Sequence, residues 1–113
     1  MIHLVTAIIK PHKLQEVKDA LQANGAMGLT ISEVQGFGRQ GGHSETFRGS
    51  EYKIDFVPKV KVEVLVESST VPVVLDAIAG AAHTGKIGDG KVWTVGLDDL
   101  LRVRTGEIGD DAL

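Results

Sequence analysis

The chain has 113 residues, which by length is one domain, large enough for a two-layer core and too short for two domains. Its 42% hydrophobic and 24% charged residues are ordinary for a soluble globular protein and do not suggest disorder. The net charge of −3 argues against broad binding to nucleic acid or to an anionic membrane, so an anion site requires a local cluster of cations. The absence of cysteine excludes disulfides, a thiol nucleophile and thiolate metal sites, and fits a reducing cytosol.

The chain begins with a short apolar stretch that predicts a buried strand. Residues 2 to 9, IHLVTAII, are β-branched and apolar, and Lys10-Pro11 ends the run. The stretch lacks a basic leading region and a small-residue cleavage site, so we expect no signal peptide. No apolar run approaches the ~20 residues that a helix needs to cross a bilayer.

A helix, a second strand and a long loop are expected next. Residues 12 to 25 place three apolar side chains on one helical face, Leu14, Val17 and Leu21, and end in a glycine. Residues 29 to 37, LTISEVQGF, alternate in the manner of a strand. The segment from 38 to 55 has no apolar period and combines glycines with mixed charges. We expect a polar loop there, and loops this long in small domains are more often functional or mobile than filler.

The clearest strand in the sequence is KVKVEVLVE, residues 59 to 67. Four valines face one side of it, and the charged residues Lys59, Lys61, Glu63 and Glu67 face the other. Residues 68 to 83 follow as a helix, with Ser69 or Thr70 expected as the N-cap and Pro72 in the first turn.

A glycine-rich loop, two extended stretches (VWTV and LLRVR) and a polar tail complete the chain. The order strand, helix, strand, loop, strand, helix, strand predicts a four-stranded antiparallel sheet with both helices on one face, the ferredoxin-like α+β arrangement. The open face of the sheet must be covered or wet. Apolar residues on several strands favour self-association as the cover.

The glycine-rich loop TGKIGDGKVW, residues 84 to 93, contains most of the phosphate-binding P-loop pattern, but Val92 stands where that pattern has Ser or Thr. A P-loop leaves a strand and enters a helix whose N-terminus points at the phosphates, whereas this loop follows a helix and enters a strand. We therefore expect no helix dipole. Backbone amides freed by Gly85, Gly88 and Gly90 would instead form an anion-binding nest.

Five cations can gather around this nest in the folded chain. Lys86 and Lys91 bracket it, and Lys59 points away from the valines of its strand. Arg102 and Arg104 are two apart on the expected last strand, which places both on one face. These cations would form a site for a polyanion at the sheet edge or at a subunit junction. The alternative is that the loop is a simple turn and the arginines are solvated.

Two long motifs, GRQGGHSETFRGSEY and TGKIGDGKVW, resemble the PII nitrogen-regulatory signal proteins of the GlnB/GlnK type. The similarity runs from VTAIIKP through EVQGFGRQ and IDFVPKVKVEV to RVRTGE. It implies one PII-type domain over residues 1–113, with a mobile T-loop at 38–55, a phosphate-binding B-loop at 83–91 and a C-terminal loop at 102–113. It also implies a homotrimer with three nucleotide sites in the clefts between subunits.

The resemblance implies the ligands as well: ATP and ADP compete for one site, and 2-oxoglutarate binds beside MgATP. The residues that match the family's nucleotide contacts are Gly36, Gly38, Arg39, Gln40, Thr84, Gly85, Gly88, Asp89, Gly90, Lys91 and, from the adjacent subunit, Arg102 and Arg104. Gln40 would also ligate Mg²⁺, and 2-oxoglutarate would contact Gln40, Lys59 and Gly88. A dicarboxylate can lie beside a triphosphate only where a divalent cation and a lysine offset the repulsion, so ADP should not substitute for ATP.

The resemblance assigns the 38–55 segment to target proteins, with ligand binding at Gln40 shifting its conformations. Arg48 matches the residue that GlnK members insert into ammonium channels, and Tyr52 matches a residue that is uridylylated or adenylylated. Other implied partners are glutamine synthetase adenylyltransferase, a nucleotidyltransferase acting on Tyr52, and a regulatory kinase or transcription factor. The implied location is cytoplasmic, at the membrane only through the ammonium transporter, without direct nucleic-acid binding. Phe47 and Gly41-Gly42 depart from the family pattern and bear on partner choice.

The sequence favours a non-enzymatic sensor over two alternatives. No nucleophile–base pair or carboxylate dyad stands out, and the four histidines lack metal-ligand spacing. An RRM-like RNA-binding module shares the element order, but its central strands need stacking aromatics, which IHLVTAII and KVKVEV lack. A slow ATPase would need a residue that orients water, and none is an obvious candidate.

Overall fold

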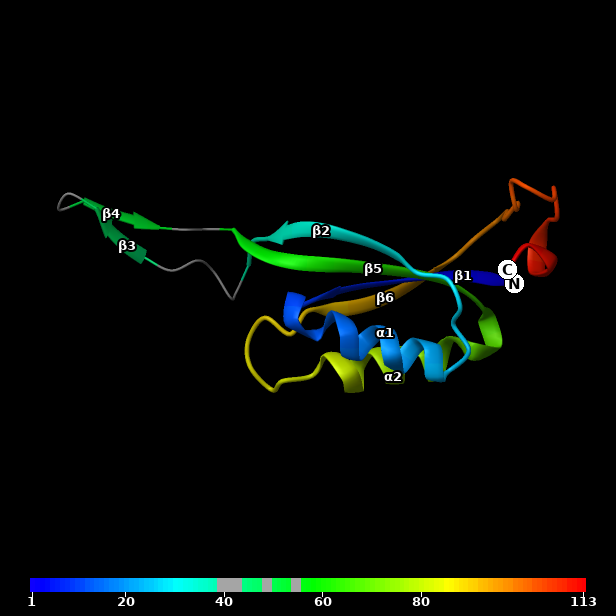
Figure 1. Cartoon of the computed structure of the whole chain (residues 1–113), viewed down its shortest axis with the longest axis horizontal. Coiled ribbons are helices and arrows are strands. Elements are labelled where there is room, and N and C mark those ends of the chain that lie inside the picture. The colour runs from blue at the N-terminus through cyan, green and yellow to red at the C-terminus, as the bar shows by residue number, and fades with distance from the viewer. Residues whose placement is uncertain (39–43, 48–49, 54–55) are drawn as a thin grey trace.

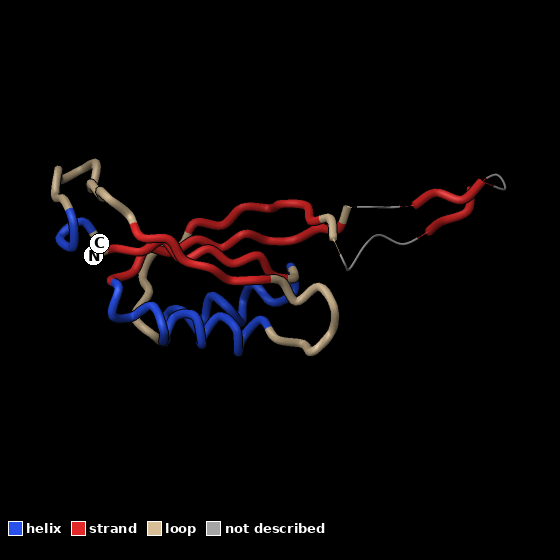
Figure 2. Tube along the Cα trace, turned by 180° about the vertical axis from the view of Figure 1, so that it is seen from behind, coloured by secondary structure: helices blue, strands red, loops and turns tan. Residues whose placement is uncertain are grey.

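A four-stranded antiparallel sheet, in the order β2-β5-β1-β6, carries two helices on one face (Figure 1, Figure 2). The structure, a computed structural model, describes residues 1–38, 44–47, 50–53 and 56–113, and only the backbone of residues 44–47 and 50–53. The elements of this core are β1 (Ile2–Ile9), α1 (Leu14–Ala23), β2 (Thr30–Gly36), β5 (Val57–Glu67), α2 (Val71–Ala82), β6 (Lys91–Gly96) and a short 3-10 helix, Gly109–Ala112. The predicted ferredoxin-like fold is confirmed.

The core lies between the sheet and the helices because alternate strand residues are apolar. The two central strands pair so that Val5 lies opposite Val64 and Ala7 opposite Val62. A slip of one residue would turn these side chains toward solvent, so burial fixes the register. The buried core residues of strands and helices are Val5, Ala7, Ile9, Val17, Leu21, Ala26, Val60, Val62, Val64, Val66, Val74, Ile78 and Ala82.

Helix α1 follows a 3-10 turn, Pro11–Lys13, and presents its predicted face to the core. Val17 and Leu21 are buried, and Leu14 packs against the core at its edge. Gly25 has a φ of 88°, which ends the helix in a conformation that glycine adopts without strain. No helix in the described part of the chain is long and apolar enough to span a membrane.

The start of α2 differs from the prediction. Ser68–Thr70 form a 3-10 turn, and Thr70 makes no side-chain cap to α2 because its hydroxyl donates to the Glu67 carbonyl at 2.8 Å. Glu67 caps the turn instead, since its carboxylate accepts hydrogen bonds from the hydroxyl of Ser69 and from its backbone N–H at 2.7 Å. These hydrogen bonds from Ser69 are the main reason that the pKa of Glu67 falls to about 2. Pro72 lies in the first turn of α2, as predicted.

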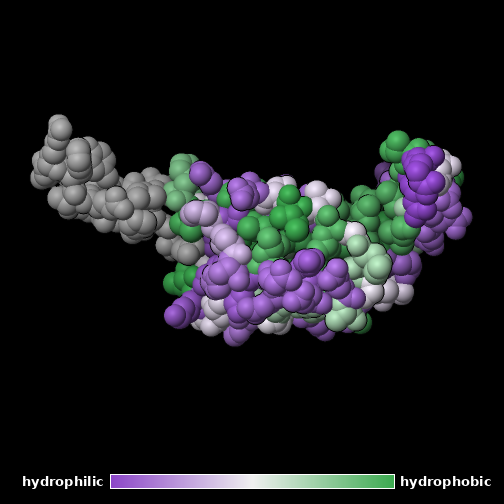
Figure 3. Space-filling model, in the orientation of Figure 1, coloured by the Kyte–Doolittle hydropathy of each residue, from purple (hydrophilic) through white to green (hydrophobic). Residues whose placement is uncertain are grey.

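Among the described residues, no helix covers the second face of the sheet, and this face exposes large apolar side chains. Cross-strand pairing places Leu4 opposite Leu65 and Val95, and Thr6 opposite Trp93, on this face. Leu65, Trp93 and Val95 are 37%, 44% and 49% exposed. Hydrophobic side chains also reach the surface above the hydrophilic exposed side of α1 (Figure 3). A bare apolar sheet face of this kind is typical of an interface between copies of a chain.

The segment expected to be a loop without secondary structure contains two paired strands, β3 (Ser44–Phe47) and β4 (Ser50–Lys53). The expectation rested on its glycines and mixed charges, which hide the short alternation. Thr46, Phe47 and Tyr52 are nevertheless residue types that favour strands.

The prediction that LLRVR forms an extended strand is wrong. Leu101 makes only an isolated bridge to Ile108, and the chain between them turns back. Gly106, with a φ of 74°, closes this turn and donates its N–H to the carbonyl of Arg102 at 2.8 Å. Arg102 and Arg104 therefore do not share one face of a strand. A glycine with positive φ overrides the weak strand pattern of so short a stretch.

Replacing Glu67 by Gln tests the cap of the 3-10 turn. We expect the variant to melt at a lower temperature than the wild-type protein at neutral pH, because an amide oxygen accepts these hydrogen bonds more weakly than a carboxylate. The folded-state pKa of about 2 lies below the ordinary value of 4.5. The carboxylate therefore stabilises the fold fully above the ordinary pKa, and this contribution disappears as the pH falls through the folded-state pKa.

Thermal unfolding followed by circular dichroism should show the difference in melting temperature shrinking as the pH falls from about 5 to about 2. A difference that stays constant over this interval would show that the charge of Glu67 does not stabilise the turn.

Candidate ligand-binding site

Residues 83–90 connect α2 to β6 and, together with Lys91 at the start of β6, form the glycine loop. The loop lies at the end of the sheet where β2 ends and β5 begins (Figure 1). Gly85, Gly88 and Gly90 have φ angles of 84°, 94° and 97°. These values belong to the left-handed region, which residues with a Cβ rarely adopt. The loop leads from α2 into β6 and no helix begins there, as expected, so the groups that it could offer to an anion are backbone amides rather than a helix N-terminus.

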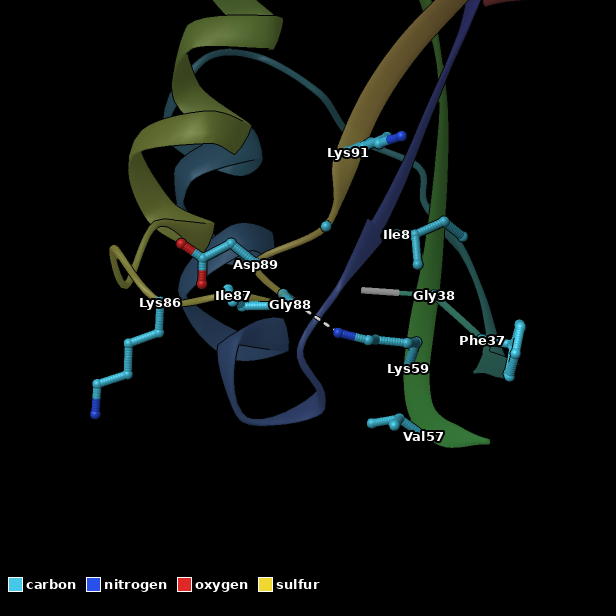
Figure 4. Close-up of a pocket in the computed structure, with 12 residues that line it drawn as sticks. Ile8, Phe37, Gly38, Val57, Lys59, Lys86, Ile87, Gly88, Asp89 and Lys91 are labelled. Atoms are coloured by element: carbon cyan, nitrogen blue, oxygen red, sulfur yellow. Dashed lines mark hydrogen bonds between the residues drawn. The ribbon is translucent and has the colours of Figure 1, made fainter. Parts of the chain in front are cut away.

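Gly90 brings this loop into direct contact with β1. A Cβ at this position would collide with the carbonyl oxygen of Ile8 and would lie 2.8 Å from its carbonyl carbon. The loop therefore passes so close to the end of β1 that Lys59, which comes from β5 on the other side of β1, reaches the carbonyl of Gly88 (Figure 4). Glycine at residue 90 is a steric requirement of the site.

A cavity of about 650 Å³ opens between the glycine loop and the ends of three strands (Figure 4). The loop contributes residues 86–91 to its lining, and the strands and their ends contribute Ile8, Gly36, Phe37, Gly38, Val57 and Lys59. This volume lies within the range of small-molecule sites. The lining combines apolar walls with backbone groups and lysines, a composition suited to an organic anion.

Lys59 is the buried cation of the cavity, with only 8% of its surface exposed. Its ammonium group donates a hydrogen bond to the carbonyl of Gly88, and its stem packs beside Gly36, where a Cβ would lie 3.3 Å from the Lys59 Cγ. Burial, followed by the nearby charge of Lys10, lowers the pKa of Lys59, while Asp89 opposes the shift. An anion bound beside Lys59 would relieve this unfavourable burial of charge.

Two more of the predicted cations line the same cavity. Lys91 begins β6 opposite Ile8 and is exposed, and its ammonium group points away from Gly88 in Figure 4. Lys86 is also exposed and extends away from Lys59 (Figure 4). The two exposed side chains have room to turn toward a ligand, whereas Lys59 is already held in place.

Asp89 is held inside the loop by its neighbours. Its carboxylate accepts hydrogen bonds from the N–H groups of Thr84 at 2.8 Å and Gly85 at 2.9 Å, and from the Thr84 hydroxyl. The ammonium group of Lys10 lies 3.2 Å from Asp89 Oδ1. These contacts, the Thr84 hydroxyl first, hold the pKa of Asp89 well below its usual range. Of the predicted nucleotide contacts, Thr84 and Gly85 therefore face Asp89 rather than line the cavity.

Within one chain, Arg102 and Arg104 lie far from the glycine loop, because β6 carries the chain to the opposite end of the sheet (Figure 1). The guanidinium group of Arg102 forms an ion pair with Glu107 at 2.9 Å and donates to the carbonyl of Leu113. A site that uses these arginines together with the glycine loop requires a second copy of the chain.

Several predicted site residues lie outside the described part of the chain. Arg39, Gln40 and Arg48 are among the undescribed residues, and Tyr52 is described only as backbone in β4. In the rest of the chain, no group of three or more histidine, aspartate or glutamate side chains could hold a metal ion. The magnesium role of Gln40 stays a prediction.

Lys10 and the apolar lining residues Ile8, Phe37, Val57 and Ile87 were not predicted from the sequence. Because Lys10 ends the first strand, its position at the end of the sheet could have been predicted, but its partner Asp89 could not.

A second cavity, of about 430 Å³, lies where residues 28–30 and 63–65 approach Leu113, and it was not predicted either. Nothing local in the sequence brings these three segments together.

Known proteins are similar to this chain over almost its whole length. A family model described as nitrogen regulatory protein P-II matches residues 2–107. A nitrogen regulatory protein P-II of Azospirillum brasilense is 54% identical over 109 residues, covering 96% of this chain and 97% of that protein. The nitrogen regulatory protein GlnK of Escherichia coli K12 is 51% identical over 110 residues, covering 97% of this chain and 98% of that protein. The crystal structure of Arabidopsis thaliana PII bound to citrate matches with a TM-score of 0.82 and 38% identity, covering 99% of this chain and 92% of that chain.

Substituting Gly90 by Ala tests the close approach to β1. We expect the free energy of unfolding to fall by about 2 kcal/mol or more, because the methyl group meets the Ile8 carbonyl and alanine disfavours a positive φ. The matched control is Gly80→Ala in α2, where no atom lies within 4 Å of the added Cβ. It should stabilise the protein by about 0.5–1 kcal/mol. Chemical denaturation measures both, and equal effects at the two positions would contradict the steric requirement.

Proposed function

Because the chain belongs to the nitrogen regulatory protein P-II family, we propose that it senses nitrogen, carbon and energy status by binding ATP, ADP and 2-oxoglutarate. The observation that carries this proposal is the cavity that the glycine loop and three lysines line. Its role is regulatory binding, and no residue of the cavity is assigned to catalysis. The 38–55 segment transmits the bound state to partner proteins.

ATP and ADP bind competitively at the glycine loop. The fit rests on the positive-φ glycines, which turn the backbone so that amides can face an anion, and on Lys86 and Lys91, which have room to reach phosphates. The carboxylate of Asp89 does not repel an anion there, since Lys10 offsets its charge and the Thr84 hydroxyl donates a hydrogen bond to it. The loop thus serves a nucleotide without the Ser or Thr of a P-loop.

2-Oxoglutarate binds at Lys59 when MgATP is present. Lys59 is buried, its pKa is lowered, and it donates only to a backbone carbonyl among the residues that the structure describes. A carboxylate is the partner that such an ammonium group favours. Mg²⁺, held by Gln40 together with ATP and 2-oxoglutarate, supplies the positive charge that lets the two anions lie together. The related Arabidopsis protein is bound to citrate, which supports a small carboxylate as ligand.

The active assembly is a homotrimer whose subunits cover the open face of the sheet. Trp93, Val95 and Leu65 supply an exposed apolar surface on that face. In the trimer, Arg102 and Arg104 of one subunit reach the nucleotide of the next, because their own glycine loop lies at the other end of the sheet (Figure 1). Assembly therefore completes the site.

The 38–55 segment is the output of the sensor. The chain enters this segment at Gly38 and continues after it at Val57, and both residues belong to the lining of the cavity. Arg48 enters an ammonium channel, and Tyr52 accepts a nucleotide from a modifying enzyme. Other targets are glutamine synthetase adenylyltransferase and a regulatory kinase or transcription factor. The protein works in the cytoplasm and reaches the membrane through the channel.

Isothermal titration calorimetry tests the ligand scheme. We expect ATP and ADP to compete for one site per subunit, and 2-oxoglutarate to bind only with MgATP. Lys59→Met should weaken the binding of 2-oxoglutarate by about tenfold or more, because a buried charge-assisted contact is lost. Lys61→Met is the matched control on the same face of β5, since Lys61 does not line the cavity. Binding of 2-oxoglutarate without nucleotide, or equal effects of the two substitutions, would contradict the scheme.

Light scattering coupled to size exclusion tests the trimer. The wild-type protein should have the mass of three chains, and Trp93→Glu should reduce it to one, because a charge on the open face cannot be buried without a partner. Val73→Glu is the control, since Val73 is 52% exposed on α2, away from the open face. A trimer that survives Trp93→Glu would place the interface elsewhere.

A further inference from the structure

We propose that Lys10, Thr84 and Asp89 form a positioning network that holds the glycine loop in its anion-binding shape before a ligand arrives. The side chains act on the loop backbone, and the backbone meets the ligand. This inference rests on the proposed function, in which the glycine loop binds nucleotide phosphates.

The network closes the loop on itself through Asp89. The Asp89 carboxylate lies near the end of the loop and accepts the N–H groups of Thr84 and Gly85 at its beginning, at 2.8 and 2.9 Å. Asp89 is flanked by Gly88 and Gly90, whose φ angles are 94° and 97°. Glycine has the greatest backbone freedom of all residues, so the held Asp89 carboxylate restrains the backbone on both sides of it, in addition to the close approach of Gly90 to β1.

Thr84 joins the parts of the network through one hydroxyl group. Thr84 Oγ1 donates to Asp89 and accepts from Lys10 Nζ and from the backbone N–H of Lys86, both at 3.1 Å. One donor and two acceptor positions are all that a hydroxyl offers, so the group is fully used. A threonine in this state is built into the loop and has no capacity left for a phosphate.

Lys10 ties the network to the sheet. It follows the last residue of β1 and lies 3.2 Å from Asp89 Oδ1, with the two side chains 13% and 23% exposed. The ion pair explains why an acidic residue can stand in a loop that binds anions, since its charge is offset from the protein side. Lys10 and Lys59 thus have different tasks: Lys10 is committed to the protein, whereas Lys59 faces the cavity.

The charge-free test is Thr84→Val, which removes the hydroxyl and keeps the shape of the side chain. Thr84 does not line the cavity, and the substitution alters no charge. We expect ATP affinity to fall by about tenfold or more, and Thr84→Ser, which restores the hydroxyl, to bind as the wild-type protein does. Calorimetry measures the affinities, and circular dichroism confirms that both variants are folded.

Lys10 is tested with a matched lysine. Lys10→Met should weaken ATP binding, and Lys10→Arg should retain most of the affinity. Lys13→Met should have no effect, because the Lys13 side chain pairs with Glu16 and is not part of the network. In a protein that already carries Lys10→Met, adding Thr84→Val should reduce ATP affinity much less than it does in the wild-type protein, since both substitutions break the same network. If Lys10→Met weakens ATP and Thr84→Val does not, the effect of Lys10 is long-range attraction and the positioning network is refuted.

A ligand-free measurement separates this inference from the proposed function. Backbone ¹⁵N order parameters of Gly88 and Gly90 should be high in the wild-type and Thr84→Ser proteins and clearly lower in Thr84→Val. A wild-type protein that binds no nucleotide would refute the proposed function while these order parameters still test the network. Unchanged order parameters in Thr84→Val would refute the network even if nucleotide binding is as proposed.

Discussion

The contact between Gly90 and the carbonyl of Ile8 is the constraint on which the site depends. The missing Cβ of Gly90 allows the glycine loop to lie against the end of β1, where Gly88 is within reach of Lys59 on the neighbouring strand. The same placement lets Lys10, at the end of β1, meet Asp89. A single steric condition thus bears on the position of two lysines at the glycine loop.

The fold could be predicted from the sequence because the periodic apolar residues of its strands and helices are the residues that become buried. The valines of residues 59 to 67 lie on the covered face of the sheet, and Val17 and Leu21 lie on the buried face of α1. The hydrogen bonds that cap the helix starts could not be predicted as well. Glu67 takes the capping role expected of Ser69 or Thr70, because hydrogen-bonding partners one or two residues apart compete on nearly equal terms.

The site was readable in part. Its glycines and lysines are local in the sequence, and the structure brings Lys59, Lys86 and Lys91 to one cavity. The ion pair of Lys10 with Asp89 joins residues that are far apart in the sequence. It depends on the path of the glycine loop, and the pattern of apolar residues does not predict that path. The predicted placement of Arg102 and Arg104 on one face of a strand was wrong for a similar reason, since Gly106 turns the chain where a strand was expected.

The ion pair of Arg102 with Glu107 has a consequence for the ionic-strength response of the proposed trimer. Arg102 already holds a carboxylate and the carbonyl of Leu113 within its own chain. A phosphate that binds Arg102 from a neighbouring subunit therefore exchanges one anionic partner for another and creates no additional ion pair. Added salt screens the old pair and the new one alike, so the salt sensitivity expected of the proposed nucleotide binding comes from the exposed lysines of the glycine loop.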